Sequence, residues 1–147
     1  MASATVYGPT MEIAPLPENL VAAAVALWHD TGLTRPWNDA VADCRRALRG
    51  PDSTVLAVRD PTGVLATAMV GHDGHRGWVY YLAVASRWRG QGLGRRMMTA
   101  CEEWVRERGI PKIQLMVRGD NATVRAFYEH LGYAPSDVVV LARRLDR

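Results

Sequence analysis

Residues 87–96 read RWRGQGLGRR, a stretch in which three glycines occupy alternate positions between flanking arginines. Glycine is unfavourable inside a strand or helix, because its backbone loses more conformational freedom on folding than that of alanine. Residues 78–84 before the stretch have the apolar, β-branched and aromatic character of a strand, and residues 93–108 repeat apolar side chains at helical spacing. The glycines are therefore predicted to join a strand to the N-terminus of a helix.

A junction of this kind is a favourable place for an anion to bind. The first backbone N–H groups of a helix have no intrahelical acceptor, and this end carries partial positive charge. Glycines allow a phosphate to approach the backbone closely, and Arg89, Arg95 and Arg96 would add charge-assisted hydrogen bonds. The alternative is a tight turn that requires glycine for its dihedral angles alone, with the arginines solvated.

Two common nucleotide-binding loops do not fit this stretch. A P-loop requires Gly-Lys-Ser/Thr, and the sequence contains no Gly-Lys pair. A dinucleotide-binding turn requires Gly-x-Gly-x-x-Gly and an acidic residue about 20 positions later. Here the spacing is Gly-x-Gly-x-Gly, and the next strand offers Gln114 instead of an acid.

The rest of the chain predicts one α/β domain over residues 11–147, preceded by a flexible leader at 1–10. Asn38 is expected to cap the second helix and Asn121 the fourth, and Asp73-Gly74 indicates a hairpin. The expected helices are 18–30, 39–49, 93–108 and the segment from Asn121 to Gly132. The expected strands are 11–13, 54–58, 64–70, 78–84, 113–117 and 138–141.

Composition excludes several classes of protein. The chain has 147 residues, a formal net charge of +3, and 18 basic residues dispersed among 15 acidic ones, so no nucleic-acid surface is expected. No apolar run is long enough to span a membrane and no signal-like segment begins the chain, which predicts a cytoplasmic protein. Cys44 and Cys101 are too few for a disulfide framework. His72 and His75 lack a third ligand, so no metal is expected.

The sequence resembles a known family. Residues 89–94, RGQGLG, match the Arg/Gln-x-x-Gly-x-Gly/Ala signature of the GNAT superfamily of acyl-CoA-dependent N-acetyltransferases. Residues 81–84 resemble its fourth strand, Asn121 and Tyr128 its Asn…Tyr helix, and residues 127–133, FYEHLGY, the end of that helix. The resemblance is close over 76–134. Residues 35–39, 73–77 and 112–114 further resemble a small bacterial branch whose acceptor is poorly defined.

The resemblance implies an α/β GNAT fold, with a mixed, mostly antiparallel sheet of about six to seven strands and four helices, splayed between strands four and five. It implies acetyl-CoA as the cofactor, with its pyrophosphate on the signature loop and its pantetheine arm beside the fourth strand and Asn121. A backbone N–H of that strand would polarise the thioester carbonyl. The implied cofactor-binding residues are Leu82, Ala83, Val84, Arg89, Gly90, Gln91, Gly92, Leu93, Gly94, Arg95, Asn121 and Tyr128.

Tyr128 matches the family's catalytic tyrosine, which protonates the departing thiolate, although a purely structural tyrosine would show the same helical spacing. The general base is open, because residues 76–81 contain no carboxylate where many family members have a glutamate. Water held by Tyr80 or Tyr81, or else His75 or Asp73, is the candidate base, and an amine of low pKa would need no strong base at all.

The acceptor is expected to be a small-molecule amine, an amino acid or a protein N-terminus. Candidate substrate residues are Trp28, Trp37, Asn38, His75, Tyr80 and Tyr81, and packing against the sheet is an equally good role for the first three. Neither cysteine matches the family's chemistry, so direct attack in a ternary complex is expected. The alternative function is a module that binds or senses acyl-CoA without transferring it. A homodimer that pairs through residues 138–141 is plausible, because strand edges are exposed unless covered.

Overall fold

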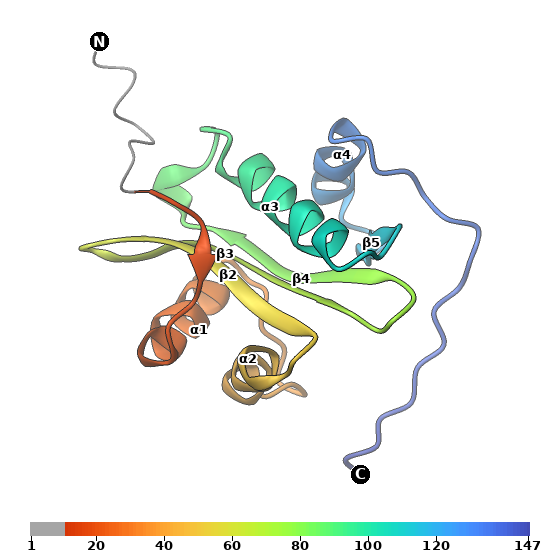
Figure 1. The fold of residues 1–147 in the computed structure, drawn as a ribbon, viewed down its shortest axis with the longest axis horizontal. Helices are drawn as coiled ribbons and strands as arrows, with labels where there is room; N and C mark the ends of the chain where they lie inside the picture. The colour runs from red at the N-terminus through yellow and green to blue at the C-terminus, as the bar shows by residue number, and fades with distance from the viewer. Residues whose placement is uncertain (1–10) are drawn as a thin grey trace. The chain divides into compact units, whose positions relative to one another are not determined.

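The structure, a computed structural model, describes residues 11–147 (Figure 1). The leader expected at 1–10 lies outside the described residues. The chain divides into two compact units, Met1–Met116 and Val117–Arg147, and each is described by itself. No helix of the described part is long and apolar enough to cross a membrane.

The first unit is built on a five-stranded sheet of order β1-β2-β3-β4-β5. Its strands are β1 Ala14–Pro15, β2 Ser53–Asp60, β3 Gly63–His72, β4 Gly77–Val84 and β5 Ile113–Leu115. Neighbouring strands are antiparallel except β4 and β5, which are parallel. The predicted hairpin at Asp73-Gly74 is confirmed, since it joins β3 to β4 and the Asp73 N–H donates to the Arg76 carbonyl at 3.2 Å.

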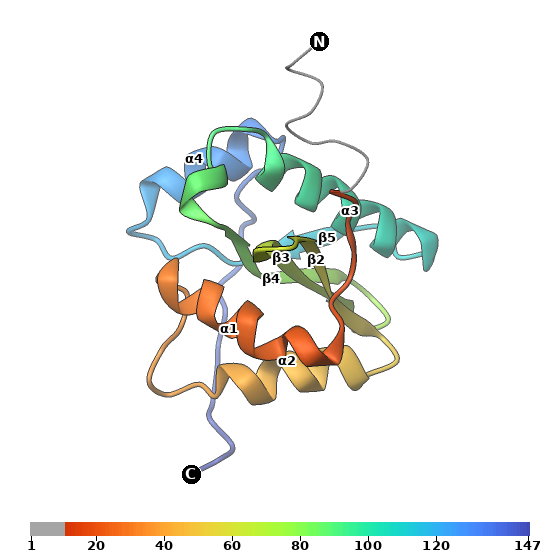
Figure 2. The same cartoon turned by 90° about the vertical axis from the view of Figure 1, so that its left-hand side faces the viewer.

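Helices cover both faces of this sheet (Figures 1 and 2). On one face lie α1 Val21–Asp30, which follows a 3-10 turn at Glu18–Leu20, and α2 Ala40–Arg49. On the other face lies α3 Leu93–Glu107. Asn38 does not cap α2 as predicted: the cap is Asp39, whose carboxylate accepts the Ala42 N–H at 3.0 Å.

The core has one layer on each side of the sheet. Trp28, Cys44 and Val55 are fully buried between the sheet and the α1–α2 pair. On the opposite face, α3 buries a row of side chains four residues apart, namely Leu93, Met97, Cys101 and Val105. Apolar burial of this kind supplies most of the driving force for folding.

Gly77 determines how closely α3 approaches β4. A Cβ atom at Gly77 would lie 2.6 Å from Cγ2 of Val105, a distance that real Cβ contacts do not reach. Glycine is therefore required at this position for close packing, and its φ angle is not the reason. The C-terminal part of α3 is fixed against the start of β4.

The prediction of six to seven strands is wrong for the described residues, which form five. Residues 11–13 are not a strand, because β1 begins at Ala14. Residues 138–141 are not a strand either, and each of their side chains is at least 59% exposed. Valine-rich sequence favours a strand only where a neighbour pairs and covers it. Dimerisation through this segment stays a prediction without a strand to support it.

The second unit contains one helix, α4 Ala122–His130. Its predicted cap is confirmed, since the Asn121 side-chain oxygen accepts the Val124 N–H at 3.2 Å. Tyr128 is buried, and its ring makes edge-on contacts with Phe127 and Tyr133, at centroid distances of 5.0 and 5.9 Å.

Candidate functional site

The glycine-rich turn between β4 and α3 has a backbone that other residues rarely adopt. After a 3-10 turn at Ser86–Trp88, Gly90 has φ of +75° and Gly92, the N-cap of α3, has φ of +79°. A Cβ atom at either glycine would meet no other protein atom within 4 Å. The dihedral angles therefore require glycine, and the space in front of the turn is open. Both roles considered for these glycines are compatible with the structure.

Positive charge gathers at the start of α3. Gly92 makes no side-chain cap, the first turn of α3 contains no acidic residue, and Arg95 is exposed there. Helices normally place acidic side chains at this end, because the helix dipole is positive there. An exposed arginine in the first turn is mildly unfavourable, and a bound anion would offset this cost.

The strand that leads into the turn separates from its neighbour. β4 pairs with β5 only over Gly77–Val79, and in the described residues it has no strand partner on that side from Tyr80 onward. Pairing between β4 and β5 thus ends at Val79, which is compatible with the expected splay between the fourth and fifth strands. Leu82, Ala83 and Val84 lie on this separated part of β4, with Ala83 buried and the other two half-buried.

β4 also contains a bulge at the same place. Its register with β3 shifts between Met69, opposite Tyr80, and Thr67, opposite Ala83. Two residues of β4, Tyr81 and Leu82, therefore correspond to one residue of β3. Tyr81 has φ of +52°, and it is the single non-glycine residue with positive φ among residues 11–147.

Tyr81 is held by contacts with both α1 and α2. Its ring stacks on Trp28, with a centroid distance of 3.9 Å and an interplanar angle of 11°. Its hydroxyl donates to Oδ2 of Asp43 at 3.0 Å. Burial and this carboxylate raise the pKa of Tyr81 to about 12, so the phenol stays protonated at neutral pH. A carboxylate on α2 therefore lies beside β4, although β4 itself has none.

The other candidate substrate residues differ in burial and come from different elements. Trp28 is fully buried and donates its indole N–H to the Thr67 hydroxyl at 2.8 Å, which supports the packing role. Trp37 is 49% exposed and Asn38 is exposed, both in the α1–α2 connection. Tyr80 is 44% exposed, and its ring lies 6.4 Å from that of Trp78.

Of the two hairpin residues proposed as bases, Asp73 has a structural task. Asp73 accepts the backbone N–H groups of Arg76 and His75 and the indole N–H of Trp78. These hydrogen bonds hold the pKa of Asp73 at about 2, which makes it a weak proton acceptor at neutral pH. His75 is exposed at the hairpin tip. The described residues contain no group of three His, Cys, Asp or Glu side chains that could hold a metal ion.

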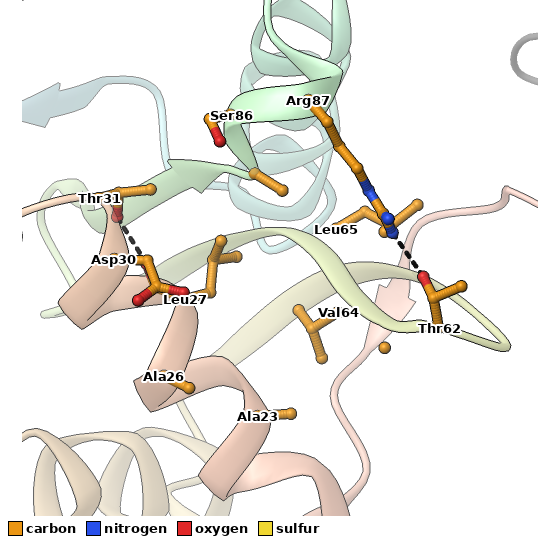
Figure 3. Close-up of a pocket in the computed structure, with 12 residues that line it drawn as sticks. Ala23, Ala26, Leu27, Asp30, Thr31, Thr62, Val64, Leu65, Ser86 and Arg87 are labelled. Atoms are coloured by element: carbon orange, nitrogen blue, oxygen red, sulfur yellow. Dashed lines mark hydrogen bonds between the residues drawn. The ribbon is translucent and has the colours of Figure 1, made fainter.

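A cavity of about 350 Å³ opens elsewhere in the first unit (Figure 3). It lies between α1, the β2–β3 turn and the segment that follows β4, with Asp30 and Arg87 among its lining residues. The Arg87 guanidinium donates to the Thr62 hydroxyl across it. None of the residues predicted to bind cofactor or substrate lines this cavity, so it adds no chemistry to the candidate site.

Asn121 and Tyr128 belong to the second unit. The side-chain oxygen of Asn121 is used by the helix cap, which leaves its amide N–H₂ as the group that would contact pantetheine. The edge-on ring contacts of Tyr128 fit a structural role, and a phenol that packs by its ring can still present its hydroxyl.

Comparison with known families identifies the chain. A family profile described as the acetyltransferase (GNAT) family matches residues 20–133. This chain belongs to the GNAT acetyltransferase family. The resemblance inferred from RGQGLG is thereby confirmed, and as a member of this family the protein is an N-acetyltransferase.

Solved structures share the GNAT fold at low sequence identity. The aminoglycoside acetyltransferase AAC(6')-Iy, in complex with a CoA-linked bisubstrate analogue, is 14% identical with a TM-score of 0.76, over 91% of this chain and 97% of that one. An aminoglycoside acetyltransferase from a soil metagenome, in complex with sisomicin, is 17% identical with a TM-score of 0.74, over 93% and 97%. A transcriptional regulator from Bacillus halodurans is 19% identical with a TM-score of 0.78, over 91% and 99%. At these identities the likeness shows the fold alone.

Sequence reasoning missed two residues that support the site. Asp43, whose carboxylate accepts the Tyr81 hydroxyl, and Thr67, whose hydroxyl donates to the Tyr81 carbonyl, were not predicted as site residues. Thr67 could have been noticed, because it is a polar residue within the apolar run Leu65–Ala68. A buried hydroxyl requires a hydrogen-bond partner.

Proposed function

We propose that this GNAT protein transfers an acetyl group from acetyl-CoA to a primary amine, by direct attack in a ternary complex. One observation carries the proposal: the edge of β4 beyond Val79 leads, through the 3-10 turn at Ser86–Trp88, to an open, positively charged turn at the start of α3. A ligand with an extended amide-containing arm and a pyrophosphate matches this order of features.

The residues present fit acetyl-CoA. The backbone N–H groups of residues 91–95 would bind the pyrophosphate, helped by Arg89 and Arg95. Leu82, Ala83 and Val84 would pair with the amides of the pantetheine arm through their backbone, and Asn121 would contact the same arm. Acetyl-CoA supplies the activated thioester, and the chain supplies binding, orientation and proton transfer.

The chemistry assigned to the chain has three parts. The amine nitrogen attacks the thioester carbonyl carbon, while a backbone N–H of the β4 bulge stabilises the developing oxyanion. As the C–S bond breaks, the Tyr128 hydroxyl donates its proton to the sulfur. The proton lost by the amine passes to water held by Tyr80 or Tyr81, and the Asp43 carboxylate beside Tyr81 supports this route over Asp73.

The acceptor is proposed to be a small-molecule amine. Two of the structures that share the fold are complexes of aminoglycoside acetyltransferases, one with sisomicin and one with a CoA-linked aminoglycoside analogue. Aminoglycosides and polyamines are therefore the first compounds to test, with amino acids and peptides carrying a free N-terminus as the second group.

The sequence also suggested a module that binds acyl-CoA without transfer, and membership of the acetyltransferase family argues against it. Residues 76–81 contain no carboxylate, and the low pKa of Asp73 removes the nearest one from use as a base. This alternative predicts acetyl-CoA affinity without amine-dependent release of CoA.

The first experiment is a thermal-shift titration with acetyl-CoA, beside CoA, ATP and NAD. A ligand at 100 times its Kd adds about 2.7 kcal/mol and should raise Tm by roughly 5–10 °C in a domain of this size. A shift with CoA compounds alone supports the proposal, and amine-dependent release of CoA thiol then separates the enzyme from the binding module. No shift at millimolar concentration would contradict it.

A further inference from the structure

Tyr81 adopts an unfavourable backbone conformation at the point where β4 separates from β5. Its φ of +52° brings the Cβ atom of a non-glycine residue close to its own backbone. Such a conformation persists only where surrounding contacts hold it, and it occurs often at functional sites. The contacts that hold Tyr81 therefore indicate what the conformation is for.

A buried chain of hydrogen bonds fixes the Tyr81 carbonyl. The Trp28 indole N–H donates to the Thr67 hydroxyl at 2.8 Å, and that hydroxyl donates to the Tyr81 carbonyl oxygen at 3.0 Å. Trp28 and Thr67 are both fully buried. Because Thr67 accepts the indole proton, its own proton is directed at Tyr81. The ring of Tyr81 is fixed as well, by its stack on Trp28 and its bond to Asp43.

Packing alone does not explain a hydroxyl at position 67. Apart from tyrosine, tryptophan and cysteine, Thr67 is the single buried polar side chain among residues 11–147. Valine has nearly the same shape and would fill the same space between Ala66 and Ala68 without a polar group to satisfy. The hydroxyl is therefore explained by its two hydrogen bonds.

Fixing the Tyr81 carbonyl also fixes the next N–H group. The peptide bonds of the described residues are trans, and in a trans peptide the C=O and the following N–H point in opposite directions. The Tyr81 carbonyl points toward Thr67 on β3. The Leu82 N–H must then point away from β3, toward the edge of β4 that β5 has left.

We infer that Thr67, oriented by Trp28, is a positioning residue that directs the Leu82 N–H at the thioester carbonyl of acetyl-CoA. This inference rests on the proposed function, because it requires acetyl-CoA to lie along the separated edge of β4. Thr67 acts through the peptide group of Tyr81 and Leu82 and does not itself touch the acetyl group.

The test is infrared spectroscopy of acetyl-CoA labelled with ¹³C at the acetyl carbonyl, bound to the protein. A hydrogen bond from Leu82 lowers the carbonyl stretching frequency relative to acetyl-CoA in solution. In Thr67→Val the frequency should return toward the solution value, while Thr67→Ser, which keeps the hydroxyl, should retain the wild-type frequency. Release of CoA should slow about tenfold to a hundredfold in Thr67→Val, with the Kd for acetyl-CoA nearly unchanged.

The outcomes separate this inference from the proposed function. If the wild type does not bind acetyl-CoA, both fail. If it binds but shows no lowered frequency, or if folded Thr67→Val keeps the wild-type frequency and rate, the positioning role fails and the binding function stands. Should Thr67→Val not fold, Thr67→Cys replaces it, because a thiol keeps the volume and donates only weakly; an unchanged frequency there would likewise overturn the role. A purely structural residue would lower Tm without moving the carbonyl frequency.

Discussion

At the scale of single residues, Tyr128 gives a direct test of the proposed enzyme chemistry against the binding-module alternative. Its ring has a structural role whichever is true, because it packs edge-on with Phe127 and Tyr133. Only the hydroxyl distinguishes the two functions, since a module that never releases CoA thiolate has no use for an acid at that position.

Replacing Tyr128 with phenylalanine should therefore lower turnover without changing affinity. The ring remains, so the packing within the second unit is kept, while the proton donor is lost. We expect kcat to fall about a hundredfold or more, and the Kd for acetyl-CoA to stay within about twofold, because general acids typically contribute factors of this size. CoA thiol release and calorimetric titration measure the two quantities.

Tyr133→Phe is the matched control, because it removes the hydroxyl from the neighbouring ring in the same unit. Equal turnover in Tyr128→Phe and the wild type would assign Tyr128 to packing alone. A parallel loss in both variants would instead point to a disturbance of the second unit.

At the scale of elements, the turn before α3 combines a conformational requirement with an expected ligand. The two glycines that bracket α3 allow these effects to be separated. Gly92 at its N-terminus has φ of +79°, Gly109 just beyond its C-terminus has φ of +76°, and neither has a protein atom within 4 Å of an added Cβ.

Valine at either position should cost similar stability, about 1–2 kcal/mol, because a β-branched residue is strained at positive φ. Only Gly92→Val should abolish acetyl-CoA binding, since its side chain would fill the open space in front of the turn. Urea unfolding and binding titrations of both variants test this. Gly92→Val with wild-type affinity would show that the turn does not bind phosphate.

The elements that the sequence predicted well are those with a local signal. The α3 stripe of Leu93, Met97, Cys101 and Val105 repeats at helical spacing, so the predicted helix 93–108 differs from Leu93–Glu107 by one residue. β1 could not be placed in this way. It has two residues, and it is a strand only because Ala14 and Pro15 pair with β2.

The same distinction applies to the site. The glycine turn was predictable because its conformation depends on consecutive residues. The contacts of Tyr81 were not, because Thr67 bonds a residue 14 positions away and Asp43 one that is 38 positions away. Only the fold brings those partners together, and no spacing rule in a single sequence shows them.

At the scale of the whole molecule, the two buried cysteines make the stability of the first unit depend on pH. Cys44 on α2 and Cys101 on α3 are fully buried, on opposite faces of the sheet. Burial raises the pKa of Cys44 to about 11 and that of Cys101 to about 12. Both thiols are therefore protonated at neutral pH, which supports direct attack over a covalent cysteine intermediate.

Stability should fall on the alkaline side for the same reason. Thiols in the unfolded chain ionise near pH 8.5, whereas the folded ones ionise above about pH 11, so the unfolded state binds fewer protons between these values. The free energy of unfolding should decrease as pH rises through this window, by up to about 1.4 kcal/mol per pH unit for each thiol. Urea unfolding at pH 7, 9 and 10.5 measures the slope.

Cys44→Ala and Cys101→Ala should each flatten that slope while lowering stability at pH 7, where the lost side chain leaves a small cavity. An equal slope in the double variant and the wild type would assign the alkaline loss to other groups. Tyr81, whose pKa is also raised, is the first of these to examine.

The missing side chain at Gly77 has a mechanical consequence for the opposite end of α3. A helix of 15 residues is about 22 Å long and rigid. The contact between Gly77 and Val105 fixes the distance of its C-terminal end from β4. Any side chain at Gly77 would push that end outward and tilt the helix, so the peptide dipoles at its other end would turn away from the phosphate they are expected to meet. The direction of α3 at the proposed phosphate site thus depends on the absence of a Cβ atom at Gly77, at the other end of the helix.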